Sequence, residues 1–159
     1  MGPSEAREAF RSLPEMFFRR AAELADQPRY RAFRDGAWLE VRWRDVERAV
    51  RELAAGLIDL GFEPGERGAI FAATSPQWIE ADLAVQSAGG VTIPIYPSNL
   101  ANEAGFILID SESRLVFCDG PKALARVREA LARGVELDDG THAALHVDAI
   151  VLFEGEPDA

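Results

Sequence analysis

The chain has 159 residues, enough for one domain or one domain with an arm. Hydrophobic residues make up 48% of it, which is ordinary for a soluble globular protein. No apolar run reaches the ~20 residues needed to span a bilayer. The opening residues, MGPSEAREAFRSL, lack the apolar core of a secretory signal. Cys118 is the single cysteine, which excludes an intrachain disulfide. Together these features predict a cytoplasmic protein.

The formal net charge of −10 is unevenly distributed. Residues 1–51 hold 11 basic and 9 acidic groups, a charge of +2. Residues 52–159 hold 6 basic and 18 acidic groups, a charge of −12. A nucleic-acid-binding protein neutralises phosphates with a basic face. The acidic remainder would repel phosphates, so the charge pattern argues against a nucleic-acid partner.

Residues 1–42 are predicted to form an amino-terminal arm, consisting of a helix and a β-hairpin. The helix follows Leu13, and its apolar stripe contains Met16, Phe17, Ala21 and Leu24. Two extended runs, 30–34 and 37–41, flank Asp35-Gly36, a dipeptide typical of tight hairpin turns. Trp38 lies in this hairpin, and we expect it to anchor the hairpin to a core.

Residues 43–159 are predicted to form an α/β subdomain. A helix over 43–60 presents Val46, Val50, Leu53, Ala54 and Leu57 on one face. Gly61 can end it in a left-handed conformation, whereas Arg42 is a poor residue for capping its start.

Strands then alternate with helices along the rest of the chain. The predicted strands are 68–73, 91–96, 115–118 and 149–153, and we expect the second to be short because it contains Pro94. Predicted helices follow them, with Ser75 capping the first, Asn99 the second and Pro121 opening the third. This alternation predicts a parallel sheet with flanking helices. The polar segment 134–147 is expected to be the least structured.

A search for catalytic motifs gives mostly negative results. The sequence contains no G-x-G-x-x-G, no G-x-x-x-x-G-K-[ST] and no G-x-S-x-G. Cys118 ends an apolar strand, which is typical of a buried structural thiol. His142 and His146 would share a helix face and could seat a metal, but two solvent-facing histidines in a loop is the favoured interpretation. Residues 119–122 are interpreted as a turn and helix start. No metal ligand or catalytic residue is assigned.

The order of several segments over residues 12–133 is nevertheless distinctive. In chain order these segments are a Trp-led helix ending in LAAGLIDLG, the turn EPGERGAI, S-x-x-W-x-x-A-D, the strand VTIPIYPS, FILIDS and LVFCDG. This order resembles the amino-terminal segment of the adenylate-forming (AMP-binding) superfamily. It is most similar to long-chain fatty-acid–CoA ligases. The implied fold is the amino-terminal α/β subdomain of such an enzyme, preceded by a helix and a β-hairpin.

The resemblance implies a two-step reaction that uses ATP, Mg²⁺, CoA and a fatty acid. The carboxylate attacks ATP to give an acyl-adenylate and pyrophosphate, and the CoA thiolate then displaces AMP. In the family a Ser/Thr/Gly-rich loop ending in Pro-Lys holds the phosphates, and this sequence lacks one. The chain is therefore expected to be a piece truncated before the phosphate loop, inactive alone and without a cofactor of its own. For the full-length enzyme, the resemblance allows peripheral membrane association and homo-oligomerisation through exposed surfaces.

Within the chain, Tyr96, Pro97, Ser98 and Asn99 are the best candidates for substrate-adjacent residues. They follow the carboxyl end of a predicted parallel strand, where ligands of open α/β sheets bind. In the family this region lies toward the acyl side of the active centre. The alternative is structural: Pro94 and Pro97 shape a turn, and Asn99 caps a helix. We favour this alternative over direct contact between these residues and a ligand.

Two other functions remain open from the sequence. The chain could be a stand-alone interaction or self-association module that has kept the ligase-like fold, since a truncated α/β domain leaves a sheet edge unprotected. It could also be an unrelated flavodoxin-like or receiver-like domain. The receiver alternative is the weakest, because the ends of the first two predicted strands carry no acidic cluster.

Overall fold

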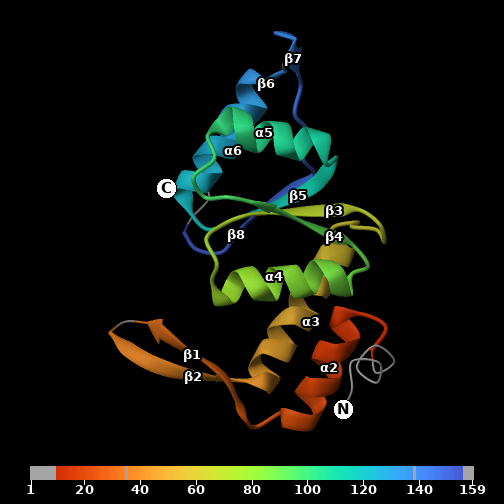
Figure 1. Ribbon diagram of the computed structural model, residues 1–159, viewed down its shortest axis with the longest axis vertical. Coiled ribbons are helices and arrows are strands. Elements are labelled where there is room, and N and C mark those ends of the chain that lie inside the picture. Colours follow the sequence, from red (N-terminus) through yellow and green to blue (C-terminus); the bar gives the residue numbers. More distant parts are fainter. Residues whose placement is uncertain (1–9, 35, 138, 156–159) are drawn as a thin grey trace, which may run out of the picture.

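The computed structural model describes residues 10–34, 36–137 and 139–155 (Figure 1). Its helices are α2 (Leu13–Leu24), α3 (Trp43–Asp59), α4 (Pro76–Ser87), α5 (Ala101–Asp110) and α6 (Pro121–Arg133). Its strands are β1 (Pro28–Arg34), β2 (Ala37–Arg42), β3 (Arg67–Phe71), β4 (Val91–Ile95), β5 (Ser113–Cys118), β6 (Val135–Glu136), β7 (His142–Ala143) and β8 (Ala149–Leu152). The predicted helix, hairpin and alternating strand–helix order is confirmed.

Four strands form one wholly parallel sheet in the order β4-β3-β5-β8. The two central strands, β3 and β5, are the most buried, because each has a neighbouring strand on both sides and helices over both faces. Pro94 lies in β4 opposite Ile70 and is tolerated because β4 is an edge strand. The expected α/β class with a parallel sheet and flanking helices is confirmed.

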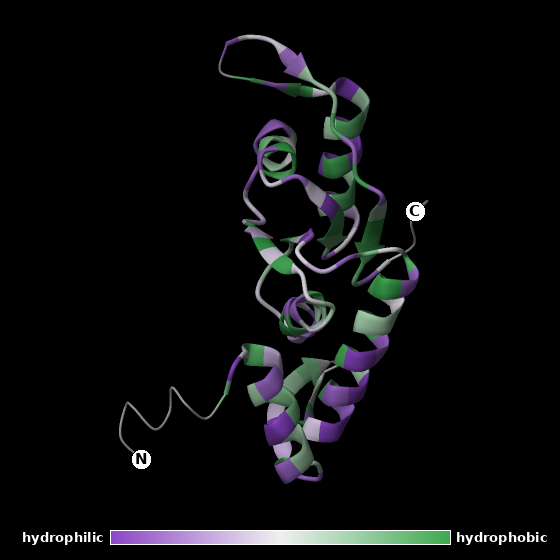
Figure 2. Ribbon diagram, turned by 90° about the vertical axis from the view of Figure 1, so that its right-hand side faces the viewer, coloured by the Kyte–Doolittle hydropathy of each residue, from purple (hydrophilic) through white to green (hydrophobic). Residues whose placement is uncertain are grey.

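Helices cover both faces of this sheet (Figure 1). Alternate residues along β3 and β5 point to opposite faces, so Phe71 and Val116 pack against α5 and α6, whereas Ile70 and Phe117 pack against α3 and α4. Figure 2 shows the strands as mainly hydrophobic and the surrounding helices as alternating between hydrophobic and hydrophilic residues. The core is therefore two apolar layers with the sheet between them.

A third, smaller apolar cluster joins the arm to the rest of the chain. Phe17 of α2, Val46 and Val50 of α3, and Leu83 of α4 are buried in it. The guanidinium of Arg29 lies 4.8 Å from the ring centroid of Phe17 and 4.6 Å from that of Trp43. Cation–π contacts of this kind fix the base of the β1–β2 hairpin against α2 and α3.

The predicted helix ends are largely confirmed. The Ser75 hydroxyl accepts a hydrogen bond of 3.1 Å from the Trp78 N–H at the start of α4. Gly61 follows α3 with φ of 87°, a conformation that favours glycine. Arg42 precedes α3 and gives it no side-chain cap, as expected.

Replacing Ser75 by alanine is expected to destabilise the chain by about 1 kcal/mol, because the Trp78 N–H loses its cap. Urea denaturation followed by circular dichroism would measure this. Ser75→Asp is the matched control, since an aspartate cap retains the hydrogen bond and should restore stability. An alanine variant as stable as the parent would contradict the capping role.

Two expectations are wrong. Asn99 does not cap α5: the capping position is Leu100, whose N–H donates to the Glu103 carboxylate at 2.7 Å. Trp38 is not anchored to a core but 69% exposed, because the hairpin projects from the body (Figure 1). The segment 134–147 has little regular structure, as expected: its described residues contain only the two-residue strands β6 and β7.

The segment after α6 folds back on α5 as the small β6–β7 hairpin. Val135 is fully buried, and a Cβ added to Gly105 would lie only 2.6 Å from its side chain. The Asn102 side chain accepts a 2.8 Å hydrogen bond from the Glu136 N–H and donates a 3.2 Å bond to the Glu136 carbonyl. This segment is therefore part of the core layer over α5 and α6.

Across the part of the chain that the structure describes, no helix has the length and apolar character needed to cross a bilayer.

Candidate active-site groove

A groove of about 360 Å³ lies at the carboxyl ends of β3 and β4. The loop that follows β3, the start of α4 and the end of β4 form its walls. Its lining residues are Ala72, Ala73, Thr74, Trp78, Pro94, Ile95, Tyr96 and Pro97. Ligands of open parallel sheets bind at this end of the strands. The lining is mainly apolar, and its polar side-chain groups are the Thr74 and Tyr96 hydroxyls and the Trp78 indole N–H.

Asp119 fixes one wall of the groove from the end of β5. Its carboxylate accepts a 3.0 Å hydrogen bond from the Ala73 N–H, in the loop after β3. A carboxylate that accepts from a backbone N–H makes a charge-assisted bond, stronger than a neutral one. The two residues are 46 positions apart in the chain, so no local sequence pattern predicts this contact.

Arg126 of α6 fixes the other wall. Its Nη1 donates to the carbonyl oxygens of Pro97 at 2.7 Å and Asn99 at 2.6 Å. The Asn99 N–H in turn donates to the Tyr96 carbonyl at 3.0 Å, which closes a turn after β4. The turn that carries the four candidate residues is therefore held to α6 by one guanidinium.

The four candidate residues do not share one surface. Tyr96, which is 78% exposed, and Pro97 line the groove. Ser98 is exposed within the turn. Asn99 faces a separate hollow of about 380 Å³ beside α5, lined also by Asn102, Glu103, Phe106, Ile107 and Glu136.

The groove can hold an apolar group, but it is not equipped for phosphate chemistry. The eight residues that line it carry no formal charge, so they offer nothing to neutralise a triphosphate or to bind Mg²⁺. Cys118 ends β5, and burial raises the pKa of its thiol to about 12, with Asp119 adding to the effect. The thiol therefore stays protonated at neutral pH and is not a nucleophile.

The two histidines do not form a helical pair. His142 lies in strand β7, and His146 is in the segment before β8, where its Nε2 is 3.1 Å from the Asp148 carboxylate. Among the residues with described structure, no group of three His, Cys, Asp or Glu side chains is placed to hold a metal ion.

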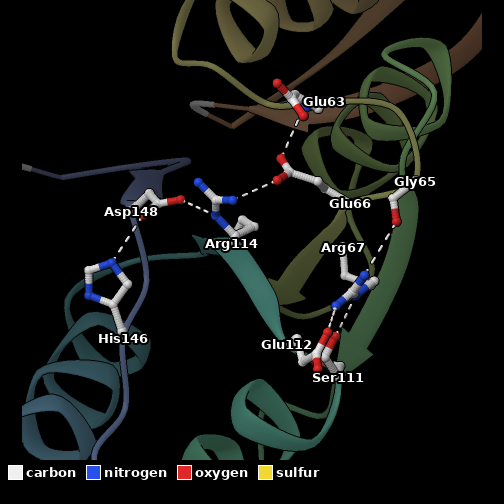
Figure 3. Close-up of polar contacts among 9 residues, drawn as sticks. All are labelled: Glu63, Gly65, Glu66, Arg67, Ser111, Glu112, Arg114, His146 and Asp148. Carbon is white, nitrogen blue, oxygen red and sulfur yellow. Dashed lines mark hydrogen bonds and ion pairs between the residues drawn. The ribbon is translucent and has the colours of Figure 1, made fainter.

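A polar cluster lies at the opposite, amino-terminal end of the strands (Figure 3). The Arg114 guanidinium contacts Asp148 and donates to the Glu66 carboxylate at 2.7 Å. Nearby, Arg67 contacts Glu112 and donates from Nε to the Ser111 carbonyl at 2.6 Å. The cavity beside Arg114 is only about 10 Å³, too small for more than a water molecule. This cluster joins neighbouring strands and is not a ligand site.

Asp148 gives the cluster a pH dependence. Its hydrogen bond from Arg114, with a second from His146, lowers the pKa of the Asp148 carboxyl. A carboxyl with a lowered folded-state pKa stabilises the fold above its unfolded pKa of about 4, and this contribution is lost as pH falls through the folded pKa. In Asp148→Asn, we expect a smaller loss of stability between neutral and acidic pH than in the parent.

Thermal melts across that pH range, at low and high salt, would measure the effect, which salt should weaken because the group is exposed. The matched control is Asp110→Asn, at an exposed carboxylate on the last residue of α5. Identical acid profiles for the parent and Asp148→Asn would contradict the role of Asp148.

The chain is an α/β domain with an apolar groove at the carboxyl ends of its parallel strands, and comparison with known proteins gives its family. Residues 17–154 match the AMP-binding enzyme family, and the chain belongs to it. The expected family is thus confirmed. Long-chain-fatty-acid–CoA ligase FadD15 of Mycobacterium bovis is 33% identical over 114 residues, which are 72% of this chain and 19% of that protein. The chain thus spans about a fifth of the length of this relative.

Solved structures show the same fold. A benzoate CoA ligase from Burkholderia xenovorans superposes with a TM-score of 0.71 at 20% identity, covering 92% of this chain and 26% of that chain. The N-terminal domain of FACL13 from Mycobacterium tuberculosis gives 0.70 at 21% identity, covering 91% and 34%. The predicted fold class, an amino-terminal subdomain of an adenylate-forming enzyme, is confirmed.

Proposed function

We propose that this chain is the amino-terminal part of an ATP-dependent long-chain fatty-acid–CoA ligase. The observation that carries the proposal is the family match over residues 17–154, together with 33% identity to a long-chain-fatty-acid–CoA ligase. The enzyme activates a fatty acid as its adenylate and then forms the CoA thioester. A cytoplasmic location belongs to the same proposal and is supported by the single, buried cysteine.

In this proposal the chain supplies scaffold and substrate-adjacent surface, while other parts of the full-length enzyme bind ATP and Mg²⁺. The uncharged groove supports this division of labour, since it suits an acyl group better than a phosphate. Tyr96, Pro97, Ser98 and Asn99 are proposed to border the acyl substrate. We further propose that residues 1–42 are an arm and residues 43–159 a subdomain completed by later sequence.

Fatty-acid-dependent exchange of pyrophosphate into ATP tests the proposal directly. We expect exchange with a long-chain fatty acid in the full-length enzyme, and none in the 159-residue chain assayed alone. A panel of aliphatic and aromatic carboxylates would identify the substrate class. Absence of exchange with every carboxylate would overturn the proposed activity, and exchange by the isolated chain would overturn its proposed inactivity.

Arg126 offers a sharper test of the groove. In the full-length enzyme, Arg126→Ala frees the turn after β4, and we expect the KM for the fatty acid to rise about ten-fold or more, with the KM for ATP unchanged. Arg126→Lys should restore part of the loss, because an ammonium can still donate to one carbonyl. Lys122→Ala, on an exposed position of the same helix, is the matched control. An equal rise in both KM values would contradict a positioning role.

Self-association is a second candidate, favoured by the open sheet edges. In the part of the chain that the structure describes, β4 and β8 each pair on one side alone. Edge strands of this kind can pair with another chain. Light scattering of the purified chain over a concentration series would decide, and a monomer at every concentration would rule out this candidate.

A further inference from the structure

Asp119, the first residue after β5, holds the loop that leaves β3 by two hydrogen bonds. Its N–H donates to the Phe71 carbonyl at 3.4 Å, and its carboxylate accepts from the Ala73 N–H at 3.0 Å. The paired register of the two strands ends one residue earlier, at Phe71 and Cys118. Asp119 therefore extends the attachment of β5 to β3 past the end of the sheet and into the loop.

Asp119 is the fixed partner in this contact. The strand before it, β5, is almost wholly buried and pairs with β3 on one side and β8 on the other. The helix after it begins at Pro121, whose ring restricts the backbone there. Ala73 and Thr74, by contrast, are exposed residues of the loop between β3 and the Ser75 cap of α4. Loss of the Asp119 carboxylate would therefore release the loop and not the strand.

The position of this loop sets the width of the groove. Ala72, Ala73 and Thr74 form the wall that the loop contributes, and their side chains are all short. A wall of short side chains lies close to the backbone, so a displacement of the backbone changes the width directly. The other wall, at the end of β4, is held separately by Arg126. At about 360 Å³ the groove is near the small end of the roughly 300–1,000 Å³ range of ligand pockets, so its width decides what fits.

We propose that Asp119 is a positioning residue for substrate selectivity, which keeps the loop wall where the groove admits a straight acyl chain and excludes a branched one. The inference rests on the proposed ligase function, which supplies the acyl group. Asp119 does not line the groove, so it acts through the backbone of Ala73. A charge-assisted bond suits this task because it is stronger than a neutral one. A methyl branch needs extra width at one point, which a fixed wall denies and a released loop can give.

The acyl selectivity of the full-length enzyme tests this role. The kcat/KM for a straight-chain fatty acid would be divided by that for methyl-branched isomers of equal carbon number, with the branch at successive positions. In the parent we expect a preference for the straight chain over isomers branched within the groove. In Asp119→Ala that preference should be about ten-fold smaller, since one carbon in a fitted apolar pocket changes kcat/KM by roughly 10–200-fold. Asp119→Asn should lie between the two, because its side-chain oxygen can still accept from the Ala73 N–H.

The ratio of two kcat/KM values does not depend on how much of the enzyme is folded, so a purely structural loss leaves it unchanged. Glu66→Ala is the matched control. Glu66 also accepts a hydrogen bond from a backbone N–H, that of Glu63 at 2.8 Å, but at the amino-terminal end of the strands (Figure 3). Hydrogen exchange of the Ala73 amide in the 159-residue chain is a second measurement that needs no activity. We expect faster exchange in Asp119→Ala than in the parent.

An active parent whose preference is unchanged in Asp119→Ala would overturn this inference alone. So would an equal loss of preference in Glu66→Ala, unchanged exchange of the Ala73 amide, or a parent that uses every branched isomer as well as the straight chain. Should Asp119→Ala fail to fold, Asp119→Asn decides the question by the same ratio. A parent that activates no carboxylate overturns the proposed ligase function itself, and this inference with it.

Discussion

Phe117→Ala is expected to destabilise the chain by about 3–5 kcal/mol. Phe117 is fully buried on the central strand β5, where it packs between the sheet and the helices α3 and α4. Its ring centroid lies 5.8 Å from that of Phe153. Removing the ring reduces the buried apolar surface and leaves a cavity. The close-packed side chains around it can move only partly to fill it. Since domains of this size are stable by only about 5–15 kcal/mol, the variant should be partly unfolded at moderate temperature.

Urea denaturation would measure this loss as a lower midpoint. Phe33→Ala is the matched control, because it removes the same ring at a position that is 61% exposed, and its effect should be well under half as large. Similar midpoints for the two variants would contradict the two-layer core.

Val135→Asp is expected to cost about 4 kcal/mol or more, since an unpaired carboxylate would replace a fully buried side chain. Val135 belongs to the apolar layer formed with α5 and α6, although it lies in a segment of polar composition. The variant should lower the melting temperature of the whole chain and not merely loosen a surface loop. Ala144→Asp places the same charge at an exposed position of the same segment and should have little effect.

Hydrogen exchange of amides in β5 would separate the two interpretations of this segment. If Val135→Asp left β5 protected, the segment 134–147 would be a peripheral loop, as its composition indicates. If protection is lost in β5 as well, the segment is part of the cooperative unit.

The sequence predicted the elements that depend on short-range patterns. The apolar run 115–118, the Asp-Gly turn and the Ser75-Pro76 helix start each identify an element without knowledge of the rest of the chain. The parallel sheet follows from their alternation. The order of the strands and the packing of two helices on each face could not be predicted from the sequence, because they depend on contacts between distant segments.

The candidate groove was predicted only in part. The carboxyl end of β4 could be found, because ligands of parallel sheets bind there. Asp119 and Arg126, which fix the groove walls, could not be found. The partner of Asp119 lies 46 residues away, and the two partners of Arg126 lie 29 and 27 residues away. All three partners are backbone atoms, which every residue type carries, so no side-chain pattern marks them. Trp38 was misplaced for a related reason: hydrophobicity predicts burial, and it says nothing of a hairpin that leaves the body.

The buried Cys118 thiol makes the opening of the sheet measurable in solution. The chain has a single cysteine, and it is fully buried at the end of the central strand β5. A thiol reagent can reach it only in molecules whose sheet has opened, because the enclosed, protonated sulfur is unreactive. The rate of labelling without denaturant thus counts how often the centre of the fold becomes exposed. Cys118 is therefore a built-in probe of rare opening of the native state.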